Sequence, residues 1–421
     1  MGAQNGHFDG APPICQAMVR ENGQRVVSAP TPAINLAASV LTPQPARPKP
    51  KPKPRIVRPP RPRVAVTARN LAIFLGVVFC GAFLADALIF RTDLYTPFLE
   101  PQSTTGYVER IVYTETHRPP TGKKEVLVLG NSRIAEAFSA RIANEYQQDG
   151  YWFLNCAFLA STARPWYYFV RDIDPQRNRY AAIAIPIDDY SDSDLLEDPT
   201  DRALELKLVI NRLRVTDILP FTFSFPSWAS RFEVARGSTF KGVGFQLDLQ
   251  EFIEHPAKRL KDASDYRLHG ADWIYGYGGD SHSLAGLSVD WAHRRVTFPP
   301  GMPQDDLLAK LILAEPRQTG SLRDFQIKWL GALVDLYRGS KTKIIIYQVP
   351  RNLAPRPTPL AHWPSTTVDE LRKRPWVKII DPTVFEPLEK PELFFDYIHL
   401  NADGRKLFSP LLADTVKAAL Q

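Results

Sequence analysis

The chain has 421 residues and a formal net charge of +7. Residues 1–69 carry 11 lysines and arginines against two acidic residues, a net charge of +9, which leaves the remainder near −2. The excess positive charge therefore lies in the N-terminal segment. It does not support nucleic acid as a partner of the folded part.

The first 66 residues are predicted to be a disordered cytoplasmic tail. Proline alternates with lysine and arginine between Pro45 and Pro62, a composition that favours extended polyproline conformations and cannot build a core. Two roles stay open for this tail. It either docks on a cytoplasmic partner or on anionic lipid headgroups, or it is a plain spacer.

Residues 67–92 are predicted to hold one transmembrane helix. Leu71–Phe90 contains a single charged residue, Asp86, and its length matches the hydrocarbon core of a bilayer. Because the basic segment comes first, the positive-inside rule predicts a cytoplasmic N-terminus and an extracytoplasmic, periplasmic C-terminal domain anchored in the plasma (inner) membrane. The alternatives are a signal peptide cleaved near Ala85-Asp-Ala87 and a buried core helix.

The three cysteines fall one to each predicted compartment. Cys15 lies in the tail, Cys80 in the apolar stretch and Cys156 in the outer domain, so we expect no disulfide outside the membrane. Metal-type Cys/His spacing does not occur in the sequence, and no metal or cofactor is predicted.

Residues 93–122 are expected to be a linker, and residues 123–421 to form one α/β domain. Short apolar runs alternate there with segments of helical spacing, which is typical of a doubly wound parallel sheet. The predicted strands are Val126–Leu129, Trp152–Leu154, Ala181–Ile187, Lys343–Val349 and Val377–Ile380. The predicted helices are Ile134–Gln147, Ala163–Asp172 and Ser321–Tyr337. Residues 191–314 break the pattern and are interpreted as an insertion that caps or frames the site, or as a second small domain.

Two distant segments hold the parts of a serine nucleophile system. The predicted strand before Gly130-Asn131-Ser132 places the hydroxyl at a helix N-terminus, and Asp396 and His399 follow about 260 residues later. His399 would take the proton of Ser132, and Asp396 would orient the imidazole. Asn401 is the expected N-cap of the last helix, which Pro410 should kink or divide. The alternative is an ordinary N-cap turn and an ordinary loop.

These segments resemble the SGNH/GDSL hydrolase superfamily, whose members have a flavodoxin-like three-layer α/β/α fold. Gly130-Asn131-Ser132-Arg133 stands where the family has Gly-Asp-Ser-Leu, and Asp396-Tyr-Ile-His399-Leu is similar to the family's Asp-x-x-His-Leu. The second and third family blocks correspond to the segments around Ala160, at the usual Gly, and Asp188, at the usual Asn.

The resemblance implies an oxyanion hole made by Ser132, Ala160 and position 188. Ala160 still offers a backbone N–H, whereas an ionised Asp188 has the wrong charge to stabilise an oxyanion. Three explanations remain open. Asp188 points elsewhere and another donor replaces it, which we favour; it is protonated; or the site has lost most hydrolytic power.

A single span followed by an SGNH-like domain is similar to the membrane-anchored subgroup that includes the D-alanyl transfer protein DltD and the SGNH-like proteins of alginate acetylation. This resemblance implies an acyl, typically acetyl, esterase or acyltransferase that acts on a cell-envelope or secreted polysaccharide through an acyl-serine, beside a membrane-bound O-acyltransferase partner. The alternative is a catalytically weak domain that binds or scaffolds polymer in an export complex.

Other residues invite functional interpretations. Arg133 could bind an anionic group of the substrate, although a solvated arginine at a helix start is the expectation. The aromatic stretches Trp166–Tyr168 and Trp273–Tyr277 could stack on sugars, but we expect them to pack. We expect surface or cap positions for the remaining histidines: His269, His282, His293 and His362.

Overall fold

The computed structural model describes residues 67–421, apart from residues 93, 120, 149, 188–192, 195–198, 303–304, 314–316, 319 and 352–365. The predicted tail, residues 1–66, lies outside the described residues, and so do Asp188 and His362. The chain divides into two compact units. The folded domain begins at Ala85, within the last turns of helix α2 (Ala68–Phe90).

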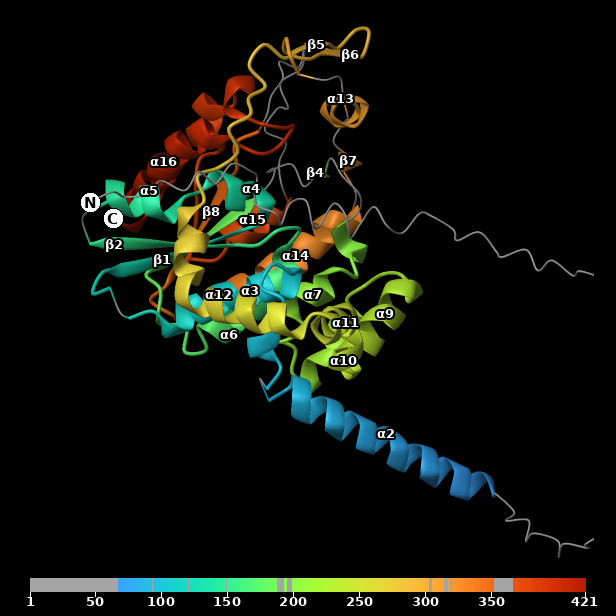
Figure 1. The fold of residues 1–421 in the computed structure, drawn as a ribbon. Coiled ribbons are helices and arrows are strands. Elements are labelled where there is room, and N and C mark those ends of the chain that lie inside the picture. Colours follow the sequence, from blue (N-terminus) through green and yellow to red (C-terminus); the bar gives the residue numbers. More distant parts are fainter. Residues whose placement is uncertain are drawn as a thin grey trace, which may run out of the picture. The chain divides into compact units, whose positions relative to one another are not determined.

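A five-stranded parallel sheet forms the centre of the domain (Figure 1). Its strand order is β2-β1-β3-β8-β9, which follows the pattern 2-1-3-4-5 of flavodoxin-like sheets when only these strands are counted. All four neighbouring pairs are parallel. The strands are β1 (Lys124–Gly130), β2 (Tyr151–Ala157), β3 (Ala182–Ile187), β8 (Lys343–Gln348) and β9 (Val377–Ile379). All five predicted strands are confirmed.

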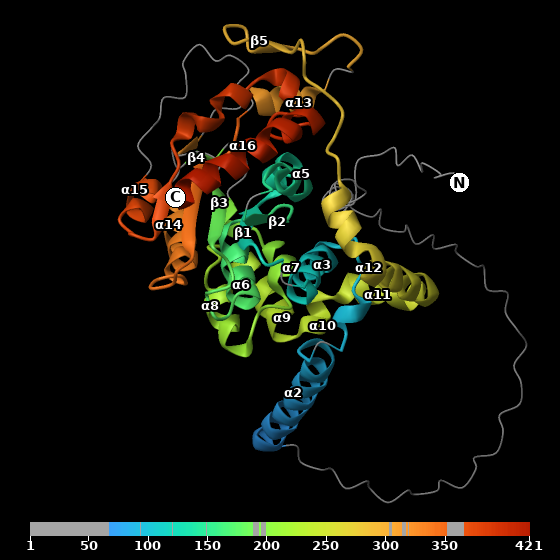
Figure 2. The same ribbon diagram turned by 90° about the vertical axis from the view of Figure 1, so that its left-hand side faces the viewer.

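The sheet is buried on both faces, which is why its strands are almost continuously apolar. On β1, Leu127 and Leu129 join one hydrophobic cluster, and Val126 and Val128 join the other. One face is covered by α3 (Thr104–His117), α6 (Ala163–Ile173) and α14 (Gly320–Asp335). The other is covered by α4 (Ser132–Ala137), α5 (Ala140–Tyr146) and α16 (Ala402–Leu420). Figure 2 shows these layers with the sheet between them.

Three helix predictions need correction in detail. Ile134–Gln147 is two helices, because Phe138 is extended and Ser139 caps a new helix by accepting a hydrogen bond from the Ile142 N–H at 3.3 Å. The expected linker contains α3, whose Val108 and Ile111 are buried in the core. Pro410 does not divide the last helix, which runs unbroken to Leu420.

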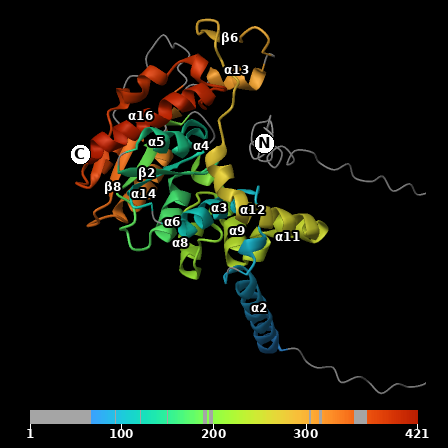
Figure 3. The same ribbon diagram turned by 60° about the vertical axis from the view of Figure 1, so that its left-hand side comes forward.

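The region between β3 and α14 is largely helical. It contains α7 (Glu205–Val209), α8 (Ile218–Thr222), α9 (Trp228–Thr239), α10 (Lys241–Gly244), α11 (Gln246–Glu254), α12 (Pro256–Gly276) and α13 (Asp306–Ile312). It also contains the hairpin β5 (Ser288–Asp290) and β6 (Arg295–Thr297), and strand β4 (Ser193–Asp194), which pairs with β7 (Arg317–Gln318). Figure 3 shows the hairpin and α13 on the same side of the sheet as α16, whereas α8, α9 and α11 lie on the opposite side. The short helix α15 (Thr366–Arg372) precedes β9.

One helix is long and apolar enough to cross a membrane, by length and composition. This is α2, Ala68–Phe90, which includes the predicted apolar stretch. The structure thus supports one candidate span among the described residues and leaves its orientation as a prediction.

Candidate active site

Ser132, His399 and Asp396 lie in hydrogen-bond contact in the order that the sequence predicts. The Nε2 atom of His399 is 2.9 Å from the Ser132 hydroxyl, and the Nδ1 atom of the same ring is 2.7 Å from a carboxylate oxygen of Asp396. Both distances fall within the range for hydrogen bonds. A carboxylate on Nδ1 favours the tautomer that leaves Nε2 free to accept the serine proton. The ordinary-turn alternative does not account for this alignment.

The position of Ser132 is set by the turn between β1 and α4. Ser132 is the first residue of α4, and Asn131 caps the helix by accepting the Arg133 N–H at 3.0 Å. Gly130 is required because a Cβ at this position would overlap the side chain of Ile134 in the next helical turn. The close approach of strand and helix holds the hydroxyl at the carboxyl end of the sheet, where ligands bind in open α/β folds.

The loop that carries Asp396 and His399 is closed by its own hydrogen bonds. One oxygen of Asp396 accepts the backbone N–H groups of Ile398 at 2.9 Å and His399 at 2.7 Å, and the other contacts the imidazole. Burial acts to raise the pKa of Asp396, but these hydrogen bonds and the neighbouring imidazole outweigh it and leave the pKa below its usual value. Asp396 is therefore ionised at neutral pH and can stabilise a positive imidazolium.

The last helix supports both halves of the site. Asn401 caps it, as predicted, by accepting the N–H groups of Asp403 at 3.1 Å and Gly404 at 3.0 Å. Arg405 donates 2.7 Å to the carbonyl of Ala135 and also to that of Glu136, at the end of the helix that begins with Ser132. The serine helix and the histidine loop are thus joined through a buried arginine.

Ala160 has a backbone conformation that favours glycine. Its φ is +55°, in the left-handed region that an alanine adopts at a cost of about 1–2 kcal/mol. The next residue, Ser161, donates its hydroxyl to the Gly130 carbonyl at 3.0 Å, which ties this loop to the turn before Ser132.

Two backbone donors of this region carry no hydrogen bond to the rest of the site. Within the described part of the chain, no acceptor bonds the N–H of Ser132 or of Ala160. Neither N–H is committed to an acceptor within the described residues, which is one requirement of an oxyanion-hole donor. The third expected position, Asp188, lies outside the described residues, and its three explanations stay open.

A second carboxylate, which sequence reasoning missed, lies beside the histidine. Glu136 follows Ser132 by one helical turn, is 4% exposed, and accepts the Tyr277 hydroxyl at 2.6 Å. Burial raises the pKa of Glu136, while Tyr277, His399 and Arg405 act in the opposite direction. The available signal was its spacing of four from Ser132, which places both residues on one helical face.

Arg133 is not a solvated helix-start residue, and that expectation was wrong. It is buried, and its guanidinium donates 2.8 Å to the carbonyl of Pro350, just beyond β8. The bond links the carboxyl ends of two strands, so Arg133 has a structural role whether or not it meets substrate.

The aromatic stretches and histidines fall largely where packing and exposure were expected. Trp166 and Tyr168 are buried in the core, whereas His282 and His293 have exposed side chains. The side chains of His269 and Trp273 lie outside the described set.

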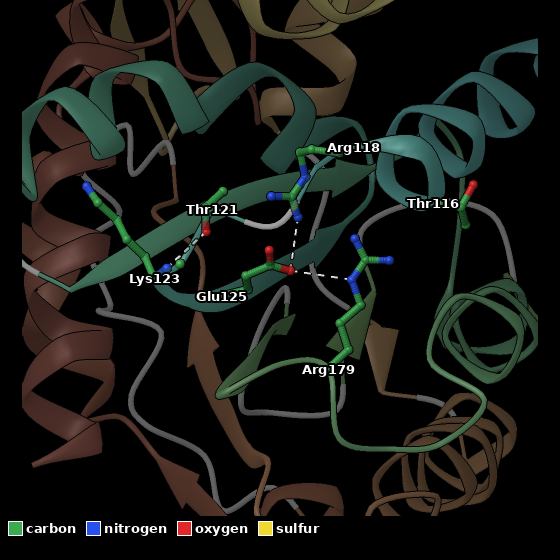
Figure 4. Close-up of a pocket in the computed structure, with 7 residues that line it drawn as sticks. Thr116, Arg118, Thr121, Lys123, Glu125 and Arg179 are labelled. Atoms are coloured by element: carbon green, nitrogen blue, oxygen red, sulfur yellow. Dashed lines mark hydrogen bonds and ion pairs between the residues drawn. The ribbon is translucent and has the colours of Figure 1, made fainter.

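A pocket of about 520 Å³ lies far from this chemistry, near the amino end of β1 (Figure 4). Glu125 in its floor pairs with Arg118 at 2.9 Å and with Arg179 at 3.4 Å. The seven residues of β1 separate it from Ser132 by roughly 20 Å. None of the predicted site residues lines this pocket, so we assign it no role in the reaction.

No family model matches the chain, and no curated protein matches it. The function is therefore inferred from the geometry of the site and the sequence motifs that form it.

Proposed function

We propose that the chain is a membrane-anchored serine esterase or O-acyltransferase of the SGNH type. The observation that carries the proposal is the hydrogen-bonded sequence Ser132–His399–Asp396 at the carboxyl end of the sheet. An N–H pair at Ser132 and Ala160 without acceptors among the described residues supports it.

The proposed reaction has two halves. In the first, the Ser132 oxygen attacks the carbonyl carbon of an ester while His399 takes the hydroxyl proton, and the N–H groups of Ser132 and Ala160 stabilise the oxyanion. Collapse breaks the ester bond, the leaving alcohol takes the proton from His399, and an acyl-serine remains. In the second half, water or a sugar hydroxyl attacks the acyl-serine, and the same imidazole takes and returns a proton.

The substrate class rests on the sequence resemblance. We propose O-acyl groups, acetyl above all, on a cell-envelope or secreted polysaccharide, with a membrane-bound O-acyltransferase as the partner that supplies or shares them. The domain would then lie outside the cytoplasm. Whether water or a sugar accepts the acyl group depends on which nucleophile reaches the acyl-serine.

A serine-directed fluorophosphonate tests the proposal. The full chain should form a covalent adduct on Ser132 by peptide mass spectrometry, and Ser132→Ala should abolish it. Ser340→Ala is the matched control, because Ser340 lies just before β8 and donates its hydroxyl to the Arg177 carbonyl, at the amino end of the sheet and away from Ser132. A folded wild-type chain that forms no adduct would favour the polymer-binding scaffold instead.

A further inference from the structure

Helices α8 and α9 present an apolar surface outward. We call it the α8–α9 face, and it comprises Val215, Leu219, Phe223, Trp228 and Phe232. Trp228 is 77% exposed and Phe232 is 71% exposed. Within α9 the pattern of an ordinary surface helix is inverted, because the residues turned inward are mainly small: Ser230, Val234, Gly237 and Ser238.

The members of this face lie side by side. The guanidinium of Arg231 lies 5.2 Å from the ring centre of Trp228 and 5.8 Å from that of Phe223. Trp228 and Phe232 are four residues apart on one side of α9, and exposed Arg236 follows at the same spacing. The surface is therefore continuous and combines aromatic rings with arginines.

Both ends of the segment that carries this face are bonded to the last turns of the apolar helix. Asp86 accepts the N–H groups of Lys241 at 2.9 Å and Gly242 at 2.7 Å, at the start of α10. Arg91, just past the helix, donates 2.6 Å to the Ser238 carbonyl and 3.4 Å to that of Leu213.

The end of the candidate span is therefore part of the folded domain on this side. Phe90 is buried, and its ring packs on Phe245. Figure 2 shows α8, α9 and α10 together on one side of the domain. These contacts explain why the apolar stretch contains a charged residue, because Asp86 accepts hydrogen bonds from the folded domain.

We propose that the α8–α9 face is a membrane-docking surface that rests on an anionic phospholipid bilayer. Trp228 and Phe232 would lie at headgroup level, where aromatic side chains are favoured, and Arg231 and Arg236 would contact lipid phosphates. Between residues 214 and 241 four basic residues stand against two acidic ones. A bilayer is the fitting partner because the last turn of the candidate span, from Asp86 to Phe90, belongs to the folded domain and is bonded to the segment that carries this face. The inference does not depend on the chemistry at Ser132.

Tryptophan fluorescence tests this docking directly. The chain's eight tryptophans all lie at or after residue 152, so none is in the apolar helix. The full chain is reconstituted in phosphatidylcholine–phosphatidylglycerol vesicles whose acyl chains are brominated near the headgroup, a short-range quencher. We expect clear quenching in the wild type, and its loss in Trp228→Phe. Trp376→Phe, which removes a tryptophan packed against the core, should keep it.

A second variant retains all eight tryptophans and should weaken binding of the α8–α9 face to the bilayer. Phe232→Glu places a charge on the face and should reduce the quenching at least twofold, whereas Leu407→Glu, at a half-exposed position on α16, should leave it unchanged. Unquenched wild-type fluorescence, or equal quenching in Trp228→Phe, would overturn the proposal and assign the face to a protein partner. Since both mutated side chains of the face are largely exposed, unchanged thermal unfolding should accompany these results.

Discussion

Replacing Asp396 by asparagine should disturb the orientation of His399 while it leaves the fold of the loop intact. The asparagine carbonyl oxygen can still accept the two backbone N–H groups that Asp396 accepts at 2.9 and 2.7 Å. In Asp396 the second carboxylate oxygen lies 2.7 Å from the Nδ1 atom of His399. In the asparagine an NH₂ group takes the place of that oxygen, so it donates a hydrogen bond to Nδ1 and cannot accept one. The ring then adopts the other tautomer, in which Nε2 carries the proton and cannot accept that of Ser132.

The expected loss is large. The change removes both the tautomer and the negative charge that stabilises the imidazolium, and in serine hydrolases this costs about ten-thousand-fold in kcat. That corresponds to about 5.5 kcal/mol of transition-state stabilisation, at about 1.4 kcal/mol per factor of ten. The free energy of unfolding should change by less than about 1 kcal/mol, since the backbone hydrogen bonds remain.

Hydrolysis of an activated acetyl ester by the full chain, followed under single-turnover conditions, measures this loss. Asp381→Asn is the matched control, because Asp381 also accepts a backbone N–H, that of Thr383 at 2.9 Å, but caps a helix elsewhere. A folded Asp396→Asn protein that keeps activity within tenfold of wild type would refute the assignment of Asp396 as the orienting carboxylate.

Three further changes have expected outcomes. Ala160→Gly relieves a left-handed alanine and should raise the free energy of unfolding in urea by about 1 kcal/mol; a decrease would contradict the strain. Gly130→Ala should lower that free energy and the rate together, because the new Cβ overlaps Ile134, and unaltered values would contradict the tight turn. Burial raises the pKa of Glu136 above its ordinary value of 4.5, so the folded chain holds this proton more tightly than the unfolded chain and loses stability as the pH rises past that value. Glu136→Gln should therefore reduce the fall in the free energy of unfolding above that pH, and an unaltered pH dependence would contradict the raised pKa.

The sheet was predictable because its strands are buried on both faces. Near-continuous apolar runs such as Ala182–Ile187 have no other stable environment in a chain of this composition. The break at Phe138 was not predictable, since it depends on Ser139 capping a second helix rather than on a helix-breaking residue.

The triad could be proposed from sequence because each half has a local signature. Ser132 comes two residues after the end of a strand, and Asp396 and His399 share one tight loop. Arg405 was missed for the opposite reason, because its role arises from contacts between α16 and α4 that no local pattern encodes. Glu136 was missed although its spacing from Ser132 was available, because its partner Tyr277 lies 141 residues away. Arg133 was misjudged because its partner, Pro350, lies more than 200 residues away.

The hydrogen bonds that join α16 to α4 and α5 determine when the site can form during synthesis of the chain. Along α16, Arg405 bonds α4, Ser409 accepts the Ser139 N–H at 2.9 Å, and Asp414 accepts the Tyr146 hydroxyl at 2.8 Å. Ser132 therefore has neither its base nor its supporting helix until residues made about 270 positions later have emerged and docked. Such long-range closure is slow relative to local folding. A nascent or truncated chain should accordingly be inert toward acyl esters it meets on its way, and reactivity would appear only when the domain is whole.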